Sequence, residues 1–373
     1  EGLLLRNLLF VRDGRINHGL SEQVCAGIAT PPRNPVELLA DLQAQVAANQ
    51  AGVNALQRLV DREGQAVVQR QMDALQSHAA RCVERLLERL DVGVHQLSLD
   101  DGSVLAVAIR LDRGRQRLVL DFTGTSDQRP GNFNAPLAVT RSVVLYVIRC
   151  LLEDDIPLNE GCFTPLELAV PLGSMLNPRP PAAVVAGNVE VSQALCNLLF
   201  GAFGVLAAGQ GTMNNLSFGD GERQYYETVA GGGGAGVGFN GSVALQTHMT
   251  NSRLTDPEVL ETRYPVRLER FAIRAGSGGD GQWRGGDGLE RTIRFLEPMT
   301  VSVISGSRRV PPFGLHGGES GACGVNLRIG IDGAKQRLAG AVQLELKAGE
   351  AIQLLTPGGG GMGASRLSDG ECV

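Results

Sequence analysis

The chain has 373 residues, 43% hydrophobic and 20% charged, a composition typical of a folded globular protein and unlike that of a disordered chain. Its formal net charge of −5 lacks the basic excess of nucleic-acid-binding proteins, so we expect no nucleic-acid partner. Glycine is unusually abundant: 50 residues gather in clusters that lack the three-residue period of collagen. These clusters predict tight turns and pockets lined by backbone.

The first third of the chain has helical periodicity. Asn34-Pro35-Val36-Glu37 is typical of a helix N-terminus, because asparagine accepts from free N–H groups and proline has no N–H to leave unpaired. Apolar residues then recur at helical spacing as far as Leu90, with a break at Gly64. The pattern predicts two successive helices packed as a hairpin over residues 34–92.

Beyond residue 94 the apolar period changes to two, which predicts a β-hairpin of strands 104–111 and 117–122. Further elements are expected as buried helices at 135–152 and 189–208, early strands at 166–170, 182–186 and 224–229, and late strands at 266–273, 289–295, 300–305, 325–331, 341–346 and 351–355. The fold class is therefore α+β. We expect a core at 1–264, with the helical hairpin at 34–92 and a mixed region at 94–264, and a β-rich module at 265–373.

The seven cysteines are odd in number and never spaced as CxxC, which favours free thiols in a reducing compartment. We therefore expect a cytoplasmic protein. The most apolar stretch, 191–209, contains Ser192, Gln193 and Asn197, so a buried helix is favoured and no membrane partner is expected. The chain begins with Glu rather than Met, which suggests a fragment of a longer protein.

A strand predicted at 224–229 is followed by four consecutive glycines, 231–234. Backbone N–H groups without neighbouring Cβ atoms suit an oxyanion or a carboxylate, although a flexible turn explains the same run. If the run binds substrate, Gly232→Val should abolish activity and leave the fold intact.

The segment 248–253 combines an acid–base residue, His248, with the hydrogen-bonding side chains of Thr250 and Asn251. Arg253 has the planar guanidinium that clamps carboxylates with two hydrogen bonds. A polar loop that precedes a helix near Pro257 explains the same spacing equally simply.

Two other polar segments resemble binding sites. Asn188 and Glu190 open the second buried helix, where they can bind an anion or act as ordinary caps. The glycine turn that contains Asn214 can grip an amide carbonyl or form an Asx turn. The five histidines lie far apart, and there is neither a P-loop nor a GxSxG motif, so we expect no bound metal and no phosphate loop in this chain.

Several motifs occur in order along nearly the whole chain: DFTGTS (121–126), NFNAP (132–136), DIPLNEG (155–161), LNPRPPA (176–182), VAGNVE (185–190), QGTMNN (210–215), YYETVAGGGG (225–234), WRGGDG (283–288) and TPGGGG (356–361). This series resembles the hydantoinase B/oxoprolinase family, and most closely the B half of 5-oxoprolinases.

The resemblance implies ATP-dependent opening of a cyclic amide, in which 5-oxo-L-proline becomes L-glutamate. An A half phosphorylates the lactam oxygen, and the B half hydrolyses the activated intermediate. It implies a hydantoinase A-type ATPase partner, separate or fused, which holds ATP and Mg, and an oligomeric assembly. On this basis His248 is expected to shuttle a proton and Glu227 to act as base or orienter. The residues expected to hold substrate are Asn188, Glu190, Asn214, Gly231, Gly232, Gly233, Gly234, Thr250, Asn251 and Arg253.

The sequence departs from the family at its N-terminal side. Full B halves carry a preceding segment whose Asp- and His-rich motifs ligate a divalent metal ion and activate water, so we expect that segment, and not this chain, to bind the metal. Three alternatives stay open: a hydantoin or another lactam as substrate, carboxylation of a ketone as in acetophenone carboxylases, and a truncated scaffold that only binds the A half.

Overall fold

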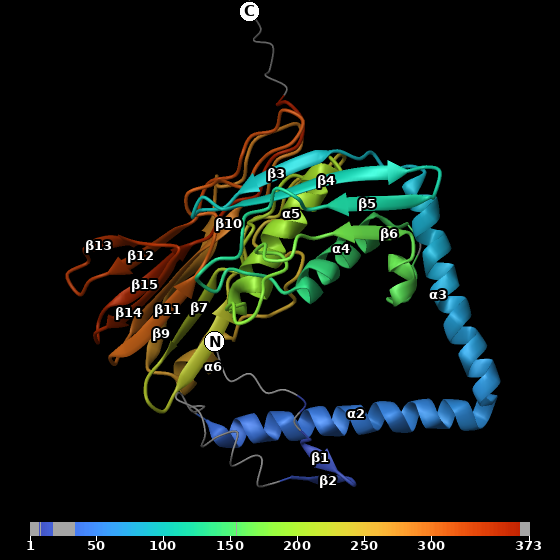
Figure 1. The fold of residues 1–373 in the computed structure, drawn as a ribbon. Helices are drawn as coiled ribbons and strands as arrows, with labels where there is room; N and C mark the ends of the chain where they lie inside the picture. Colours follow the sequence, from blue (N-terminus) through green and yellow to red (C-terminus); the bar gives the residue numbers. More distant parts are fainter. Residues whose placement is uncertain (1–6, 8, 18–33, 154, 366–373) are drawn as a thin grey trace, which may run out of the picture.

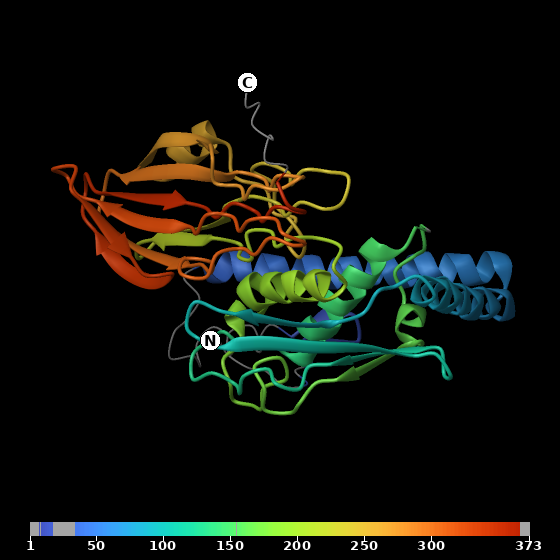
Figure 2. The same cartoon turned by 90° about the horizontal axis from the view of Figure 1, so that it is seen from above.

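The computed structural model describes residues 7, 9–17, 34–153 and 155–365, which form two lobes and a helical arm (Figure 1). Seen from above, the two lobes lie side by side (Figure 2). The predicted α+β class is confirmed, because one lobe combines a sheet with helices and the other contains two antiparallel sheets. His18, Cys25 and Cys372 lie outside the described residues.

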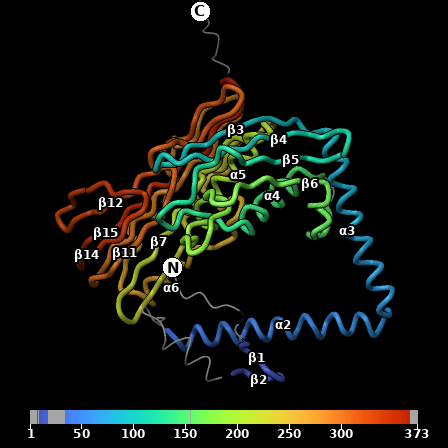
Figure 3. The backbone as a smooth tube through the Cα atoms, viewed as in Figure 1, coloured from blue at the N-terminus to red at the C-terminus, as the bar shows by residue number. Residues whose placement is uncertain are grey.

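The arm consists of the short strands β1 (Val11–Arg12) and β2 (Arg15–Ile16) and the helices α2 (Pro35–Glu63) and α3 (Gln65–Leu87). As predicted, Asn34 caps α2: its Oδ1 accepts a hydrogen bond from the backbone N–H of Glu37 at 3.1 Å. Gly64 joins the helices with φ 84°, a conformation that glycine adopts readily. The two helices meet there at a steep angle, so they form an L and do not lie along one another as a hairpin (Figure 3).

In the described part of the chain, the second half of α3 anchors the arm to the first lobe. Ala79, Cys82, Val83 and Leu86 are buried against the first lobe at helical spacing. By contrast, no residue of α2 is buried.

The first lobe is built on a four-stranded sheet in the order β3 (Val94–Ser98), β4 (Val104–Asp112), β5 (Arg117–Asp121) and β6 (Leu166–Ala169). The predicted hairpin is confirmed by the antiparallel pairing of β4 with β5. β6 pairs with β5 in parallel, which requires a crossover, and helix α4 (Leu137–Leu151) and the short turn η1 (Glu160–Phe163) lie in it. Fully buried side chains of α4, among them Val143, Val144 and Val147, pack into this core.

The second buried helix begins with a wide π turn, η2 (Gly187–Val191), and continues as α5 (Ser192–Ala202). It is shorter than the expected 189–208, because Gly204 takes φ 68° and ends the helix. The predicted strand at 182–186 is wrong, since the chain there leads into the π turn. Nearly every residue of α5 is buried within the protein, and this burial accounts for the apolar character of residues 191–209. No helix in the described part of the chain combines the length and apolarity that a membrane span needs.

The second lobe contains a five-stranded sheet of β13 (Lys335–Leu338), β12 (Val325–Ile329), β15 (Ala351–Leu355), β10 (Gly288–Phe295) and β9 (Val266–Arg274). The other sheet contains β14 (Ala341–Leu346), β11 (Met299–Ile304), β7 (Asn215–Gly219) and β8 (Gln224–Thr228), and helix α6 (Pro257–Arg263) precedes β9. The two sheets share one core, in which the rings of Phe218 and Phe295 lie 5.3 Å apart. Because β7 pairs with β11, this β lobe recruits strands from before the boundary expected at residue 265.

The glycine clusters form a stack of backbone segments at the end of the second lobe that faces α5 and β3 (Figure 3). Neighbouring segments are joined by backbone hydrogen bonds: Gly279 N–H donates to Gly359 O, Gly359 to Gly286 O, Gly286 to Gly233 O, and Gly233 to Ser242 O, all within 2.9 Å. A Cβ atom on most of these residues would collide with a neighbouring carbonyl group. The stack explains the unusual glycine content, since only glycine permits such close approach of backbones.

Candidate functional site

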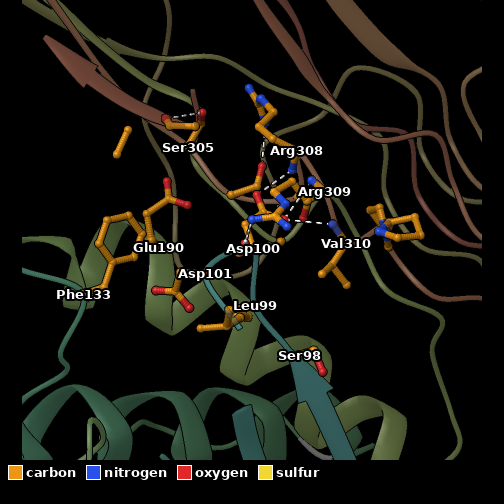
Figure 4. Close-up of a pocket in the computed structure, with 18 of the residues that line it drawn as sticks. Ser98, Leu99, Asp100, Asp101, Phe133, Glu190, Ser305, Arg308, Arg309 and Val310 are labelled. Atoms are coloured by element: carbon orange, nitrogen blue, oxygen red, sulfur yellow. Dashed lines mark hydrogen bonds between the residues drawn. The ribbon is translucent and has the colours of Figure 1, made fainter. Parts of the chain in front are cut away.

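A cavity of about 710 Å³ lies between the two lobes (Figure 4). Its walls come from the loop after β3, from one side of η2 and α5, from the loop after β11, and from the β13–β14 turn. The polar and charged lining residues include Asp100, Asp101, Glu190, Asn197, Arg308, Arg309 and Arg337. The cavity is therefore an amphipathic site assembled from segments that are distant in sequence, as ligand sites often are.

Asp100 holds the two lobes together at the wall of this cavity. Its Oδ2 accepts from the backbone N–H of Arg308 at 2.6 Å, and its Oδ1 accepts from those of Arg309 at 2.9 Å and Val310 at 2.8 Å. Three backbone donors on one carboxylate fix the 308–310 loop to the end of β3, as Figure 4 shows.

Glu190 lies on the π turn and faces the cavity with only 4% of its surface exposed. Its Oε1 accepts from Thr212 Oγ1 at 2.8 Å and from Asn215 Nδ2 at 2.7 Å. Burial removes water from the charged form and raises the pKa of this carboxyl to about 8. Near neutral pH Glu190 is therefore mostly an uncharged acid, which can donate a hydrogen bond as well as accept one.

Arg308 is the buried cation of the same region. Its guanidinium donates to Asn326 Oδ1 at 3.1 Å, to the Gly306 carbonyl at 2.6 Å and to Asn214 Oδ1 at 2.8 Å. Burial lowers its pKa to about 10, so the group stays charged at neutral pH. Asn214 also donates to Gln210 Oε1 at 2.7 Å, so its amide positions Arg308. Asn214 is not among the residues that line the cavity, although the sequence predicted that it holds substrate.

A second polar cluster lies behind the segment 208–211. The Nε2 atom of His248, Thr250 Oγ1, Thr247 Oγ1 and Gln193 Oε1 are all buried without a hydrogen-bond partner in the described residues. Gln193 Nε2 donates to the Thr247 carbonyl at 3.0 Å, and a Cβ on Gly209 would lie 3.5 Å from His248 Nε2. Ala208 and Gly211 line the cavity, so only this short segment separates the cluster from it.

His248 is held in an unusual conformation within that cluster. Its φ is 56°, and its Nδ1 lies 3.3 Å from the hydroxyl of Tyr146. The ring lies among Tyr146 and Phe200, and burial lowers its pKa to about 4. The imidazole is thus neutral at physiological pH, and its Nε2 has no hydrogen-bond partner among the residues that the structure describes.

Comparison with known proteins identifies the family. Residues 1–365 match the family model described as Hydantoinase B/oxoprolinase. The chain belongs to the hydantoinase B/oxoprolinase family. It is 44% identical over 343 residues to 5-oxoprolinase 1 of Arabidopsis thaliana, a match that covers 88% of this chain and 27% of that protein. The chain therefore spans less than a third of the length of this relative.

Solved structures share the fold of this hydantoinase B/oxoprolinase chain. The ATP-dependent caprolactamase from Pseudomonas jessenii superposes with a TM-score of 0.81 at 23% identity, covering 95% of this chain and 65% of that one. An acetone carboxylase, solved without nucleotide, gives a TM-score of 0.81 at 16% identity, with 95% and 56% covered. At these identities the likeness shows the fold alone.

The structure separates the residues expected at one site of this family member. Glu190 lines the cavity, His248 and Thr250 lie in the neighbouring cluster, and Asn188, Asn251 and Arg253 are exposed outside the cavity lining. Arg253 therefore makes no carboxylate clamp within the cavity.

The position of Glu227 argues against the expectation that it acts as a base. Its two carboxylate oxygens accept from Arg291 Nε at 2.7 Å and Nη2 at 2.9 Å, and Tyr225 donates to it at 2.8 Å. The side chains of the pair are each 1% exposed, inside the β lobe. A buried carboxylate whose two oxygens already accept from an arginine and a tyrosine is not placed to receive a proton from substrate.

Two of the four glycines 231–234 use their backbone N–H groups within the protein, so these groups cannot form the predicted oxyanion cradle. The N–H of Gly232 donates to the Pro357 carbonyl at 2.9 Å, and that of Gly233 donates to the Ser242 carbonyl at 2.8 Å. A Cβ on Gly232 would collide with the backbone of Gly286 and Gly359. Gly232→Val would therefore damage the fold, contrary to our expectation from the sequence.

Sequence reasoning missed Asp100, Arg308 and Gln193. Their signals were weak: an acidic pair before Gly102, an arginine pair after a strand, and one amide in an apolar helix. The sequence does not show that these residues lie near one another, because the contacts between them form only in the tertiary structure.

The described residues contain no group of three or more His, Cys, Asp or Glu side chains that could hold a metal ion. The described residues therefore do not fit the metal that the family resemblance implies.

Proposed function

We propose that this chain is the catalytic B-half region of an ATP-dependent cyclic-amide hydrolase that opens 5-oxo-L-proline to L-glutamate. ATP and Mg would bind to a hydantoinase A-type partner, separate or fused, which phosphorylates the lactam oxygen. An amide is a poor electrophile, and phosphorylation converts its oxygen into part of a leaving group. The 44% identity to a 5-oxoprolinase over 88% of the chain supports this reaction class.

One observation carries the assignment of the site: a buried carboxyl lines a cavity that also contains arginines, and burial raises its pKa to about 8. Glu190 can donate a hydrogen bond to the lactam carbonyl or to the oxygen of the activated intermediate. Arg309 and Arg337 line the same cavity and carry the positive charge that a substrate carboxylate requires. A neutral donor beside cations suits a ligand that combines an amide with a carboxylate.

We propose that His248 completes the reaction as the proton shuttle. A neutral imidazole accepts a proton without first losing one, and Tyr146 next to Nδ1 orients the ring. Thr250 and Gln193 lie in the same cluster and are available to hold the ring nitrogen or the water that reaches it. The cluster lies behind Gly209, so a small shift of this segment would join it to the cavity.

We place the reaction in the cytoplasm, because the described cysteines are free thiols, as a reducing compartment favours.

The test uses the protein as its cells make it, combined with its A-type partner, Mg and ATP. Release of ADP and of the ring-opened product is measured with 5-oxo-L-proline, a hydantoin, caprolactam, and acetone with bicarbonate. We expect glutamate and ADP in equal amounts with 5-oxo-L-proline. Turnover of a hydantoin or caprolactam alone would correct the substrate, carboxylation of acetone would correct the reaction class, and no turnover with any of them would favour a scaffold.

Two variants test the site. Glu190→Gln keeps a hydrogen-bond donor and should retain part of kcat/KM, whereas Glu190→Ala should lower it by about 100-fold. Equal activity of Glu190→Ala and the wild type would remove Glu190 from the site.

A further inference from the structure

Four buried polar atoms lie close together behind the cavity, and none has a hydrogen-bond partner among the residues that the structure describes. They are His248 Nε2, Thr247 Oγ1, Thr250 Oγ1 and Gln193 Oε1. Folded proteins leave few buried polar atoms unpaired, because a lost hydrogen bond on such an atom costs about 1–3 kcal/mol. Four unpaired atoms in one place therefore indicate a site for a small polar ligand.

The carbonyl group of Thr247 keeps these side chains together. Its oxygen accepts from Gln193 Nε2 at 3.0 Å and from the backbone N–H of Thr250 at 3.4 Å. Gln193 is fully buried and Thr250 is only 9% exposed, so both side chains lie in the interior. Because His248 follows Thr247 directly in the chain, all four groups surround one small region.

Gly209 forms the wall of this region on the side of the cavity. Asn197, which lines the cavity, fixes its backbone: the Gly209 N–H donates to Oδ1 at 3.0 Å, and the carbonyl accepts from Nδ2 at 3.1 Å. A Cβ atom on Gly209 would lie 3.5 Å from His248 Nε2 and 3.6 Å from Thr247 Oγ1. The next nearest atom is the carbonyl oxygen of Gly232, at 3.7 Å. The side of Gly209 that carries no side chain therefore faces three polar atoms.

The chemistry of these groups favours water as the ligand. The threonine hydroxyls donate or accept, Gln193 Oε1 accepts, and a neutral imidazole nitrogen does one or the other according to its tautomer. None of the four groups carries a charge that would attract an anion. A buried water needs two to four polar partners of this mixed kind, and the four groups supply them.

We propose that an ordered water molecule binds beside Gly209, hydrogen-bonded to His248 Nε2 and Thr247 Oγ1. Tyr146 lies 3.3 Å from Nδ1, so the water gives the second ring nitrogen a partner and fixes the orientation of the imidazole. The role of this water rests on the proposed function of His248 as proton shuttle. The water gives a proton to Nε2 as it takes one up from the reacting groups, so only O–H and N–H bonds change.

The first test is a crystal structure of the protein as its cells make it, at a resolution that shows ordered water, together with that of Gly209→Ala. We expect a water within about 2.7–3.2 Å of both His248 Nε2 and Thr247 Oγ1. Gly209 does not have a positive φ, so alanine fits its backbone, and the added methyl group should displace the water. The proposal is overturned if no water is seen, if another ligand binds there, or if another segment of the protein pairs with these atoms.

Turnover gives a second measurement. Thr247→Val keeps the shape of the side chain and removes its hydroxyl, so kcat should fall by about 10-fold with little change in KM, as expected for one lost hydrogen bond. Thr262→Val is the matched control, because Thr262 lies on α6 and its hydroxyl donates to the Glu258 carbonyl; it should keep the wild-type kcat.

The two proposals fail in different ways. A water that is present in the crystal, with an unchanged kcat in Thr247→Val, would overturn its role in proton transfer. If the wild type turns over none of the substrates, the proposed function is refuted, and the crystal structures alone decide whether the water site exists.

Discussion

Replacing Gly359 by alanine should destabilise the protein strongly, although it adds one methyl group. An added Cβ would lie 1.9 Å from the Gly233 carbonyl oxygen, and ordinary contact begins near 3.4 Å, so the segments must separate by about 1.5 Å. Gly359 N–H donates to Gly286 O at 2.9 Å, and its own carbonyl accepts from Gly279 N–H at 2.9 Å. Separation therefore strains hydrogen bonds on both sides of the residue.

The magnitude follows from these two effects. Overpacking of a tight interior costs about 1–3 kcal/mol, and two weakened backbone hydrogen bonds add about 1 kcal/mol each. We expect the free energy of unfolding to fall by about 3–5 kcal/mol. Gly131→Ala is the matched control, because no atom of the described residues lies within 4 Å of the position that its Cβ would take, and it should change stability by less than about 0.5 kcal/mol.

The assay is urea denaturation followed by tryptophan fluorescence and circular dichroism. Trp283 is the single tryptophan, and it pairs with Met362 inside the glycine stack, so its fluorescence reports this region directly. The reasoning fails if Gly359→Ala unfolds at the same urea concentration as Gly131→Ala.

Three further predictions concern charged groups. The native Glu190 carboxyl keeps its proton up to about pH 8, whereas the unfolded one loses it near 4.5, so the native state binds more protons and stability should fall as pH rises from 6.5 to 8. Glu190→Gln should flatten this slope, which pH-dependent urea denaturation measures; an equal slope in both proteins would contradict the raised pKa. Arg291→Met should cost about 3–5 kcal/mol in the same assay, because it leaves Glu227 buried and unpaired, and the double variant Arg291→Met with Glu227→Met should recover most of the loss. The pH profile of kcat should show no inflection near 6.5 from His248, since burial lowers the pKa of this imidazole to about 4. An inflection near 6.5 that His248→Gln removes would contradict the lowered pKa and show a solvated imidazole. Tyr146→Phe should lower kcat more than it raises KM, because the Tyr146 hydroxyl lies next to Nδ1 of His248.

Local features of the fold were predictable from sequence. Asn34 and Pro35 predicted the start of α2, and the change of the apolar pattern to a two-residue period predicted β4 and β5. The late strands also lie close to their predicted ranges. These features depend on residues within a few positions of one another, where caps and alternation act directly. The pairing of β7 with β11 joins strands about 80 residues apart, and the positive φ of Gly64 sets the angle between α2 and α3; the apolar periodicity specified neither.

The amino-acid sequence by itself determined the family, the α+β class and the clusters of glycine, because each depends on the order of motifs or on the spacing of residues close together in the chain. Only the tertiary structure decided what those residues do. It turned the 231–234 glycines from an expected cradle into packed backbone, since their N–H groups meet carbonyls of other segments. It also placed Glu227 in an ion pair with Arg291, and brought Asp100 to the 308–310 loop. A carboxylate becomes a structural anchor or a neutral acid according to its burial and its partners, and those are set when the lobes pack together.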